Sequence, residues 1–259
     1  MKWLKTWTPW LVFILISVGA LVTGAVLYRL ENMRYQAQFV LSATERMNLI
    51  EVGIPPYFRP VRHIGAVFQE EVLGTTGFRR LAESLPLARS SALLALQWIR
   101  REPTGSGREL FPIRYSYPQV AEVEYKPGTD LGDDPAQRQD IEQAAMQRHL
   151  FIAPWYRANG QVRFRAFRPI SRVKSDEREV LGFISGIYRV DELLKEVLCP
   201  YETDAIHLFV SDPRSQESVS FYCSDGKVQA TGADTKSPAS NHQLTRTVRI
   251  GGAPEAEGT

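Results

Sequence analysis

Residues that could bind a metal are scattered along the chain. The four histidines stand far apart, and none has a second imidazole or a thiol at the spacing of zinc ligands: His63, His149, His207 and His242. Asp130, Asp133 and Asp134 lie close together, but a calcium loop needs carboxylates at alternate positions around a turn glycine. We therefore expect no bound metal, and Asp134 is better explained as a helix cap.

The sequence also lacks the motifs that mark common catalytic sites. It has no Gly-x-Ser-x-Gly nucleophile motif, no phosphate-binding loop and no dinucleotide fingerprint. We therefore expect no enzymatic activity and no cofactor. The alternative is a membrane-tethered periplasmic enzyme, such as a hydrolase, which would need a nucleophile and a base that we do not find.

Five basic residues recur in a stretch that begins with strand-like alternation: Arg163, Arg165, Arg168, Arg172 and Lys174. Such a stretch can bind an anionic ligand or lipid headgroups. More often, charged residues in such a pattern lie on the solvent-exposed face of an edge strand. The whole chain has 31 basic and 29 acidic residues, a net charge of +2, so we expect no nucleic-acid partner.

Two cysteines are present, Cys199 and Cys223, both in the C-terminal third of the chain. Outside the cytoplasm they could pair and close a loop over a predicted hairpin. The alternative is two buried thiols. The sequence leaves both interpretations open.

An apolar segment near the N-terminus predicts a membrane-spanning helix over residues 9–28. No charged residue occurs from Thr6 to Tyr28. At about 1.5 Å of rise per residue, a helix of this length crosses a hydrocarbon core of about 30 Å. A cleaved signal peptide is the alternative, but the apolar run exceeds the ~7–15 residues of a signal core. Basic residues lie on both sides of the segment, so charge alone does not orient it.

The next segment, residues 29–60, predicts a stalk helix. Apolar or small residues recur in it at spacings of three and four: Leu30, Met33, Ala37, Val40, Thr44 and Met47. This stripe permits a coiled contact with a second subunit, and hence a homodimer. Packing against its own domain is the alternative. A purely structural interaction module working through this stripe is a further possibility for the function.

The remaining residues predict a mixture of helices and strands. We expect strands at residues 92–99, 111–117, 121–125, 162–166, 180–188, 205–210 and 218–222, with a weaker one at 244–250. We expect helices around residues 61–68, 78–85 and 191–198. A further helix should begin after Asp134 and run to about His149, because Pro135 suits the first helical position and Gln137 completes a capping box. The order of elements predicts an α+β fold with an antiparallel sheet, and a disordered tail at 251–259.

Several segments resemble the CHASE domain of bacterial and plant membrane receptors. They agree with it in order and spacing over roughly residues 40–200: Leu96–Trp98, Phe111–Pro118, Gly128–Arg138, Phe151–Pro154, Phe167–Ile170 and Val180–Tyr188. The resemblance implies an extracytoplasmic sensory module of a histidine kinase or diguanylate cyclase. It implies a cytoplasmic N-terminus at residues 1–8, in an inner or cell membrane, with the globular domain in the periplasm or outside the cell.

The resemblance also implies a long N-terminal helix followed by two PAS-like subdomains with mixed or antiparallel sheets. Residues 61–190 would form the membrane-distal sensory subdomain, and residues 191–250 an incomplete membrane-proximal one. The chain contains no second apolar span and no output-domain signature, so we expect it to be the input half of a longer receptor.

The distal subdomain of such receptors holds a small-molecule pocket. By this resemblance, the pocket carboxylate of the plant receptors corresponds to Asp130, which would accept hydrogen bonds from N–H groups of a ligand. The alternative is that Asp130 only stabilises the turn before the next helix. Possible pocket walls, each of which is also a candidate core residue, are Trp98, Phe111, Tyr115, Phe151 and Phe164. The chain departs from the family in two places. Where family members carry a helix, this chain has only Arg101–Leu110, and Gln147 stands in place of a small hydroxyl residue. We therefore do not expect this chain to bind the cytokinin ligand of the plant receptors.

Overall fold

The computed structural model describes residues 4–86, 90–105, 107–118, 126–174, 177–198, 206–211, 218–224 and 227–231. The predicted apolar segment and the predicted stalk form one helix, α1, from Leu4 to Gly53. The helix ends before two prolines, and a short 3-10 helix, η1 (Pro55–Phe58), follows it. Among the described residues, no helix has the length and apolar character that crossing a membrane requires.

The centre of the sensory region is a six-stranded sheet in the order β4-β1-β8-β7-β5, with β6 also paired to β7. Its strands are β1 (Leu93–Arg100), β4 (Ile113–Tyr117), β5 (Phe151–Ile152), β6 (Tyr156–Ala158), β7 (Gln161–Lys174) and β8 (Glu177–Arg189). All the pairings within this sheet are antiparallel. The predicted antiparallel α+β architecture is therefore confirmed.

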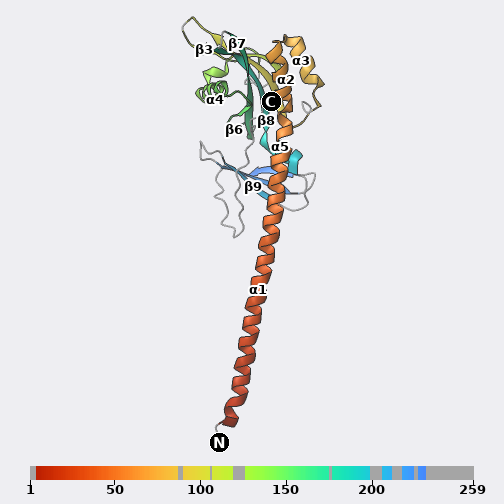
Figure 1. Cartoon of the computed structure of the whole chain (residues 1–259), viewed down its shortest axis with the longest axis vertical. Helices are drawn as coiled ribbons and strands as arrows, with labels where there is room; N and C mark the ends of the chain where they lie inside the picture. The colour runs from red at the N-terminus through yellow and green to blue at the C-terminus, as the bar shows by residue number, and fades with distance from the viewer. Residues whose placement is uncertain are drawn as a thin grey trace. The chain divides into compact units, whose positions relative to one another are not determined.

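Helices cover both faces of this sheet (Figure 1). On one face lie α2 (Arg59–Glu70) and α3 (Thr75–Ser84), where Phe68 contacts Trp98 and Phe78 contacts Tyr115. On the other lies α4 (Pro135–Met146), which places Ile141 in a buried cluster with sheet residues. We call these the α2 face and the α4 face. Because side chains alternate along a strand, neighbouring residues of β7 point to opposite faces.

The α2 face depends on two glycines. A Cβ on Gly186 of β8 would lie 2.7 Å from Cγ2 of Val61, and a Cβ on Gly65 of α2 would lie 2.3 Å from Cδ of Arg168. Real Cβ atoms do not approach other atoms so closely. Glycine at these two positions therefore allows α2 to pack directly onto β7 and β8.

The predicted cap of α4 is present. Asp134 Oδ1 accepts a hydrogen bond from the Ala136 N–H at 2.9 Å, and Gln137 Nε2 donates to the other carboxylate oxygen at 3.1 Å. Gln137 thus contacts the cap side chain, whereas in a capping box it would contact the backbone N–H of Asp134. The helix ends at Met146, three residues before the predicted His149.

After β8 the chain forms α5 (Val190–Leu198) and a three-stranded antiparallel sheet, β11-β10-β9. Strands β9 (Ile206–Ser211) and β10 (Ser218–Ser224) confirm two predictions, and β11 (Lys227–Thr231) was not predicted. The short strands β2 (Glu102–Pro103) and β3 (Glu109–Leu110) pair with each other in the segment between β1 and β4. The predicted strands 121–125 and 244–250, the tail 251–259 and Cys199 lie outside the described residues.

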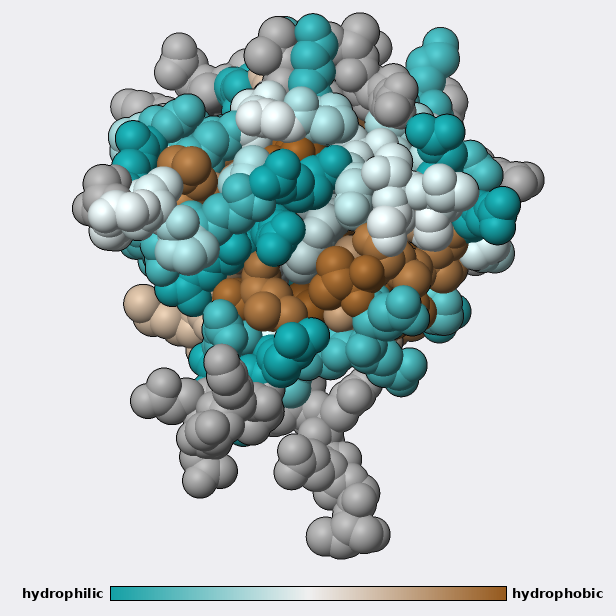
Figure 2. Space-filling view, turned by 90° about the horizontal axis from the view of Figure 1, so that it is seen from above, coloured by the Kyte–Doolittle hydropathy of each residue, from teal (hydrophilic) through white to brown (hydrophobic). Residues whose placement is uncertain are grey.

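Seen from above, hydrophilic residues cover most of the described surface, and hydrophobic residues gather mainly in one band (Figure 2). Some large hydrophobic side chains are also highly exposed. Apart from Val72 and Met146, those identified among the described residues lie on α1, where Leu15 is 78% exposed and Leu21 is 73% exposed. Helix α1 thus carries most of the exposed large hydrophobic side chains that are identified among the described residues.

Candidate ligand-binding site

Asp130 lies in the turn before η4 (Leu131–Asp133), where it forms a β-bridge with Pro112. Its Oδ1 accepts hydrogen bonds from the Phe111 N–H at 2.7 Å and the Gly132 N–H at 2.9 Å. Its Oδ2 is buried and has no hydrogen-bond partner. One carboxylate oxygen thus stabilises the turn, and the other is buried without a partner.

A cation close to this turn is held by other partners. Arg138 of α4 donates from Nε to the Gly132 carbonyl at 2.8 Å and from Nη2 to the Glu109 carbonyl at 3.1 Å. Its guanidinium also lies 5.5 Å from the centre of the Phe111 ring. Arg138 therefore fixes the position of the turn that carries Asp130.

The five aromatic residues predicted to line one pocket divide between the two faces of the sheet. Trp98, Tyr115 and Phe164 pack on the α2 face against aromatic rings of η1, α2 and α3. Phe111 and Phe151 belong to the cluster on the α4 face. The five possible pocket walls therefore do not face one common space, since residues adjacent on strands point to opposite sides. The alternative role in the core agrees with the burial of Trp98, Phe111 and Phe164.

The basic stretch also differs from the expected solvent-exposed face of an edge strand. Strand β7 lies inside the sheet between β8 and the short strands β5 and β6. Arg163 and Arg165 are only 2% and 3% exposed, whereas Arg172 is exposed. Arg163 donates to Gln161 Oε1 at 2.8 Å. The expectation of a solvent-exposed face is therefore wrong at Arg163 and Arg165, which are buried in a strand inside the sheet.

Arg165 belongs to a group of buried polar residues on the α4 face, and its other members were not predicted to form a site. Strand register places Ser116, Gln97 and Ser185 side by side on β4, β1 and β8, and Phe167 of β7 beside Ser185. Arg165, two residues before Phe167, points to the same face. Its Nη1 donates to Gln97 Oε1 at 2.8 Å.

Many atoms of this group have no hydrogen-bond partner. They are Nε and Nη2 of Arg165, Nε2 of Gln97 and the hydroxyls of Ser116 and Ser185, all of them buried. A buried polar group without a partner costs about 1–3 kcal/mol, and more when it is charged. Two sequence signals point to these residues: Arg165 belongs to the basic stretch, and Gln97 and Ser185 interrupt apolar runs of their strands.

A second polar network joins η1, the start of β1 and α5. Glu196 of α5 accepts hydrogen bonds from the Ser91 hydroxyl at 2.6 Å and from the Ser90 hydroxyl at 2.7 Å. Burial by itself raises the pKa of the Glu196 carboxyl, but hydrogen bonds from Ser91, Ser90 and Tyr57 outweigh it and hold this pKa below its usual value. Burial and the bond to Glu196 raise the pKa of Tyr57.

Tyr188 connects β8 to the same region. Its hydroxyl donates to the Tyr57 carbonyl at 3.0 Å, and its ring lies 5.3 Å from that of Phe58. Burial raises the pKa of Tyr188, so this hydroxyl stays protonated and keeps its role as a donor.

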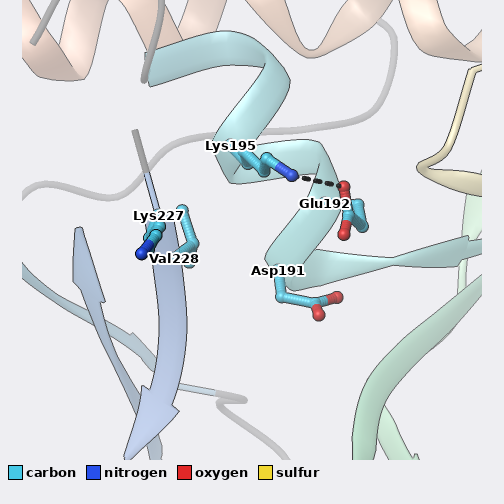
Figure 3. Close-up of a pocket in the computed structure, with 5 residues that line it drawn as sticks. All are labelled: Asp191, Glu192, Lys195, Lys227 and Val228. Carbon is cyan, nitrogen blue, oxygen red and sulfur yellow. Dashed lines mark ion pairs between the residues drawn. The ribbon is translucent and has the colours of Figure 1, made fainter. Parts of the chain in front are cut away.

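A shallow pocket of about 200 Å³ lies between α5 and β11 (Figure 3). Asp191, Glu192 and Lys195 come from α5, and Lys227 and Val228 from β11. Lys195 points toward Glu192 and forms an ion pair with it at 3.5 Å. Two acidic and two basic side chains balance one another here, and none of the predicted site residues lines this pocket.

In the described part of the chain, an antiparallel sheet thus lies between helical layers. A family model described as the CHASE domain matches residues 73–222. The chain belongs to the CHASE domain family, and its function is that of an extracytoplasmic ligand-sensing module. No curated protein matches the chain.

Among solved structures, the chain is similar to the ligand-binding domain of the amino acid chemoreceptor PctC of Pseudomonas aeruginosa PAO1, in complex with GABA. The two share 13% sequence identity, with a TM-score of 0.43. The match covers 75% of this chain and 96% of the chemoreceptor domain.

Proposed function

We propose that the chain is the input part of a membrane receptor and that it binds a small molecule on the α4 face of its six-stranded sheet. The observation that supports this site is the set of buried polar atoms on or beside that face that have no hydrogen-bond partner. Buried polar atoms in folded proteins are nearly always paired. A ligand that supplies these partners would bind more tightly to the conformation in which the atoms are buried. Its binding would therefore shift the receptor toward that conformation.

Asp130 is the proposed acceptor for an N–H group of the ligand, with Phe111 and Phe151 as apolar neighbours. Asp130→Asn tests this role, because an asparagine keeps one oxygen for the Phe111 and Gly132 N–H groups and replaces the unpartnered oxygen by an N–H donor. We expect the variant to fold and to lose ligand response. Asp133→Asn is the matched control, because Asp133 is exposed and pairs with Arg108.

The corresponding experiment is a thermal-shift screen of the full chain, purified in detergent, against a library of small metabolites. A ligand that raises the Tm of the wild type and of Asp133→Asn, but not of Asp130→Asn, supports the proposal. If no compound in the library changes the Tm, or if Asp130→Asn responds like the wild type, the proposed role of Asp130 is wrong.

We further propose that residues 9–28 anchor the chain in a membrane with the N-terminus in the cytoplasm. Support comes from the uncharged sequence between Thr6 and Tyr28, from the continuous helix α1, and from the exposed apolar side chains on that helix. The chain should float with membranes in a density gradient. Protease added outside the cell should digest the globular region and leave an epitope tag placed before Met1 intact.

Dimerisation through α1 is a separate proposal. It is supported by a mainly apolar strip along one side of this helix, formed by residues that include Met33, Ala37, Val40 and Thr44. A cysteine at Val40 should form a disulfide-linked dimer in membranes, whereas a cysteine at Gln38, on another side of the helix, should not. Equal crosslinking at both positions would contradict a specific interface.

We also propose that α5 and the sheet of β9, β10 and β11 begin the second, membrane-proximal PAS-like subdomain. The antiparallel pairing of these strands and the contact of α5 with β11 support this assignment. The absence of enzymatic activity stays a prediction from the sequence, and a disulfide between Cys199 and Cys223 stays one of two open interpretations. Cys223 is buried in β10.

A further inference from the structure

We propose that Arg165, with Gln97 and Ser185, binds the carboxylate of a small monoanionic ligand. This inference rests on the sensing function proposed above and adds the chemical class of the ligand. It concerns residues other than Asp130, because Arg165 lies on β7 and is separated along the face from the Asp130 turn by the apolar cluster around Phe167 and Phe183.

The orientation of the Arg165 guanidinium carries the argument. Its Nη1 is used in the bond to Gln97, and the two nitrogens without a partner are Nε and Nη2. The N–H bonds of Nε and Nη2 run parallel on one edge of the planar group. Two parallel donors at this spacing match the two oxygens of a carboxylate, which is the bidentate arrangement that arginine favours.

The charge of Arg165 also requires a partner. The side chain is 3% exposed, and no described carboxylate forms an ion pair with it. An isolated charge in a protein interior is strongly destabilising unless an opposite charge and hydrogen bonds compensate it. A bound anion would supply both. Because binding would relieve the cost of the unpartnered guanidinium, it would be more favourable by that amount.

The surroundings favour one negative charge over two. The second buried arginine, Arg163, already donates to Gln161, so Arg165 is the cation with open donors. A carboxylate balances its single charge, whereas a dianionic phosphate would leave one charge without compensation in a buried site. The hydroxyl of Ser185 and Nε2 of Gln97 are further donors without a partner on this face.

The apolar part of the ligand also has a place on this face. Register pairs Arg165 with Ile187 and Ile187 with Ala95, and both of these apolar residues are fully buried. They form an apolar cluster that Leu94 partly covers. A short aliphatic acid therefore fits the chemistry better than a sugar or a polyol.

The experiment compares sodium propionate and butyrate with the corresponding amides and with inorganic phosphate, using the full chain in detergent and thermal unfolding as the readout. The acids should raise the Tm, while the amides and phosphate should not. Arg165→Lys keeps the charge but removes the parallel donors, so binding should weaken about tenfold or more. Arg172→Lys, at an exposed position on the same strand, should respond like the wild type.

Arg165→Met separates recognition from a structural role. Because the unpartnered buried charge is removed and the volume is kept, this variant should unfold at the same or a higher temperature than the wild type in carboxylate-free buffer. It should not respond to the acids. A large loss of stability in this variant would assign Arg165 a structural role and overturn the inference.

The class of compound that raises the Tm separates the carboxylate assignment from ligand binding in general. If amines or neutral compounds raise the Tm while acids do not, or if Arg165→Lys responds like the wild type, the carboxylate assignment is wrong and ligand sensing stands. If no compound of any class binds, the proposed ligand-binding function fails as well.

Discussion

Arg165 reaches across strand β8 to donate a hydrogen bond to Gln97, although the two residues lie on strands that are not neighbours in the sheet. The bond is 2.8 Å long and joins two fully buried side chains. It holds the guanidinium so that one edge, Nε and Nη2, remains without a partner. The position of Gln97 therefore determines which donors of Arg165 a ligand could use.

Gln97→Glu should stabilise the protein and remove its response to carboxylates. The new carboxylate would pair with Arg165 inside the sheet and occupy the positive charge that a ligand would need. Thermal unfolding with and without butyrate measures both effects. Gln97→Leu is the control: loss of the acceptor should lower the free energy of unfolding by about 1–3 kcal/mol. A Gln97→Glu variant that still responds to butyrate would contradict this prediction.

Gly186→Ala should destabilise the sensory region by about 1–3 kcal/mol, because the added methyl would overlap Val61 and the Tyr188 ring and force α2 away from the sheet. Urea unfolding followed by circular dichroism measures the change. Gly105→Ala is the matched control, since a Cβ at Gly105 has no atom within 4 Å. Equal stability of the two variants would show that α2 does not pack on β8 as described.

Stability should fall in acid through the Glu196 network. The pKa of the folded-state carboxyl lies below its ordinary value of 4.5, so its stabilising contribution is complete above pH 4.5 and is lost as the pH falls through the folded-state pKa. Urea titrations between neutral and acidic pH measure this dependence. Glu196→Gln should be less stable at neutral pH, and its difference from the wild type should shrink in acid.

A control for the Glu196 prediction is Glu83→Gln, which changes an exposed residue of α3. Its stability should follow that of the wild type across the same pH range. If the difference between the wild type and Glu196→Gln is the same at every pH, the hydrogen bonds from Ser90 and Ser91 do not stabilise the ionised carboxylate.

Asp134→Ala should lower the free energy of unfolding by about 1 kcal/mol, because the first turn of α4 loses its side-chain acceptor. Asp133→Ala, one residue earlier and exposed, should have a much smaller effect, since its ion pair with Arg108 lies at the surface. The two variants compared in urea separate a cap from a surface charge. Similar losses in both would contradict the assignment of Asp134 as the cap.

Local patterns predicted most of the regular structure of this chain. Asp134 and Pro135 specify the start of α4 through their own backbone geometry, whatever surrounds them. The alternating residues 162–166 and the apolar residues 180–188 likewise became parts of β7 and β8. Patterns of this kind depend on neighbours close in sequence, so a single sequence is enough to read them.

The composition of the candidate site was predicted only in part. The expected turn role of Asp130 was found at one oxygen, while the other oxygen has no partner. Trp98, Tyr115 and Phe164 were expected beside Phe111 but lie on the opposite face. Alternation along a strand shows that two faces exist, but it does not show which face a helix from elsewhere in the chain will cover.

The sequence by itself determined the long N-terminal helix, the cap of α4, the strands of the sensory sheet and the resemblance to the CHASE family. Only the tertiary structure decided that Arg163 and Arg165 are buried and that Arg165, Gln97 and Ser185 share one face. An arginine that alternates with apolar residues has the same local pattern in an edge strand and in an interior strand. Strand order and register bring together residues as far apart in the sequence as Gln97 and Arg165, which are separated by 68 positions. This arrangement determines which charged side chains lose contact with water.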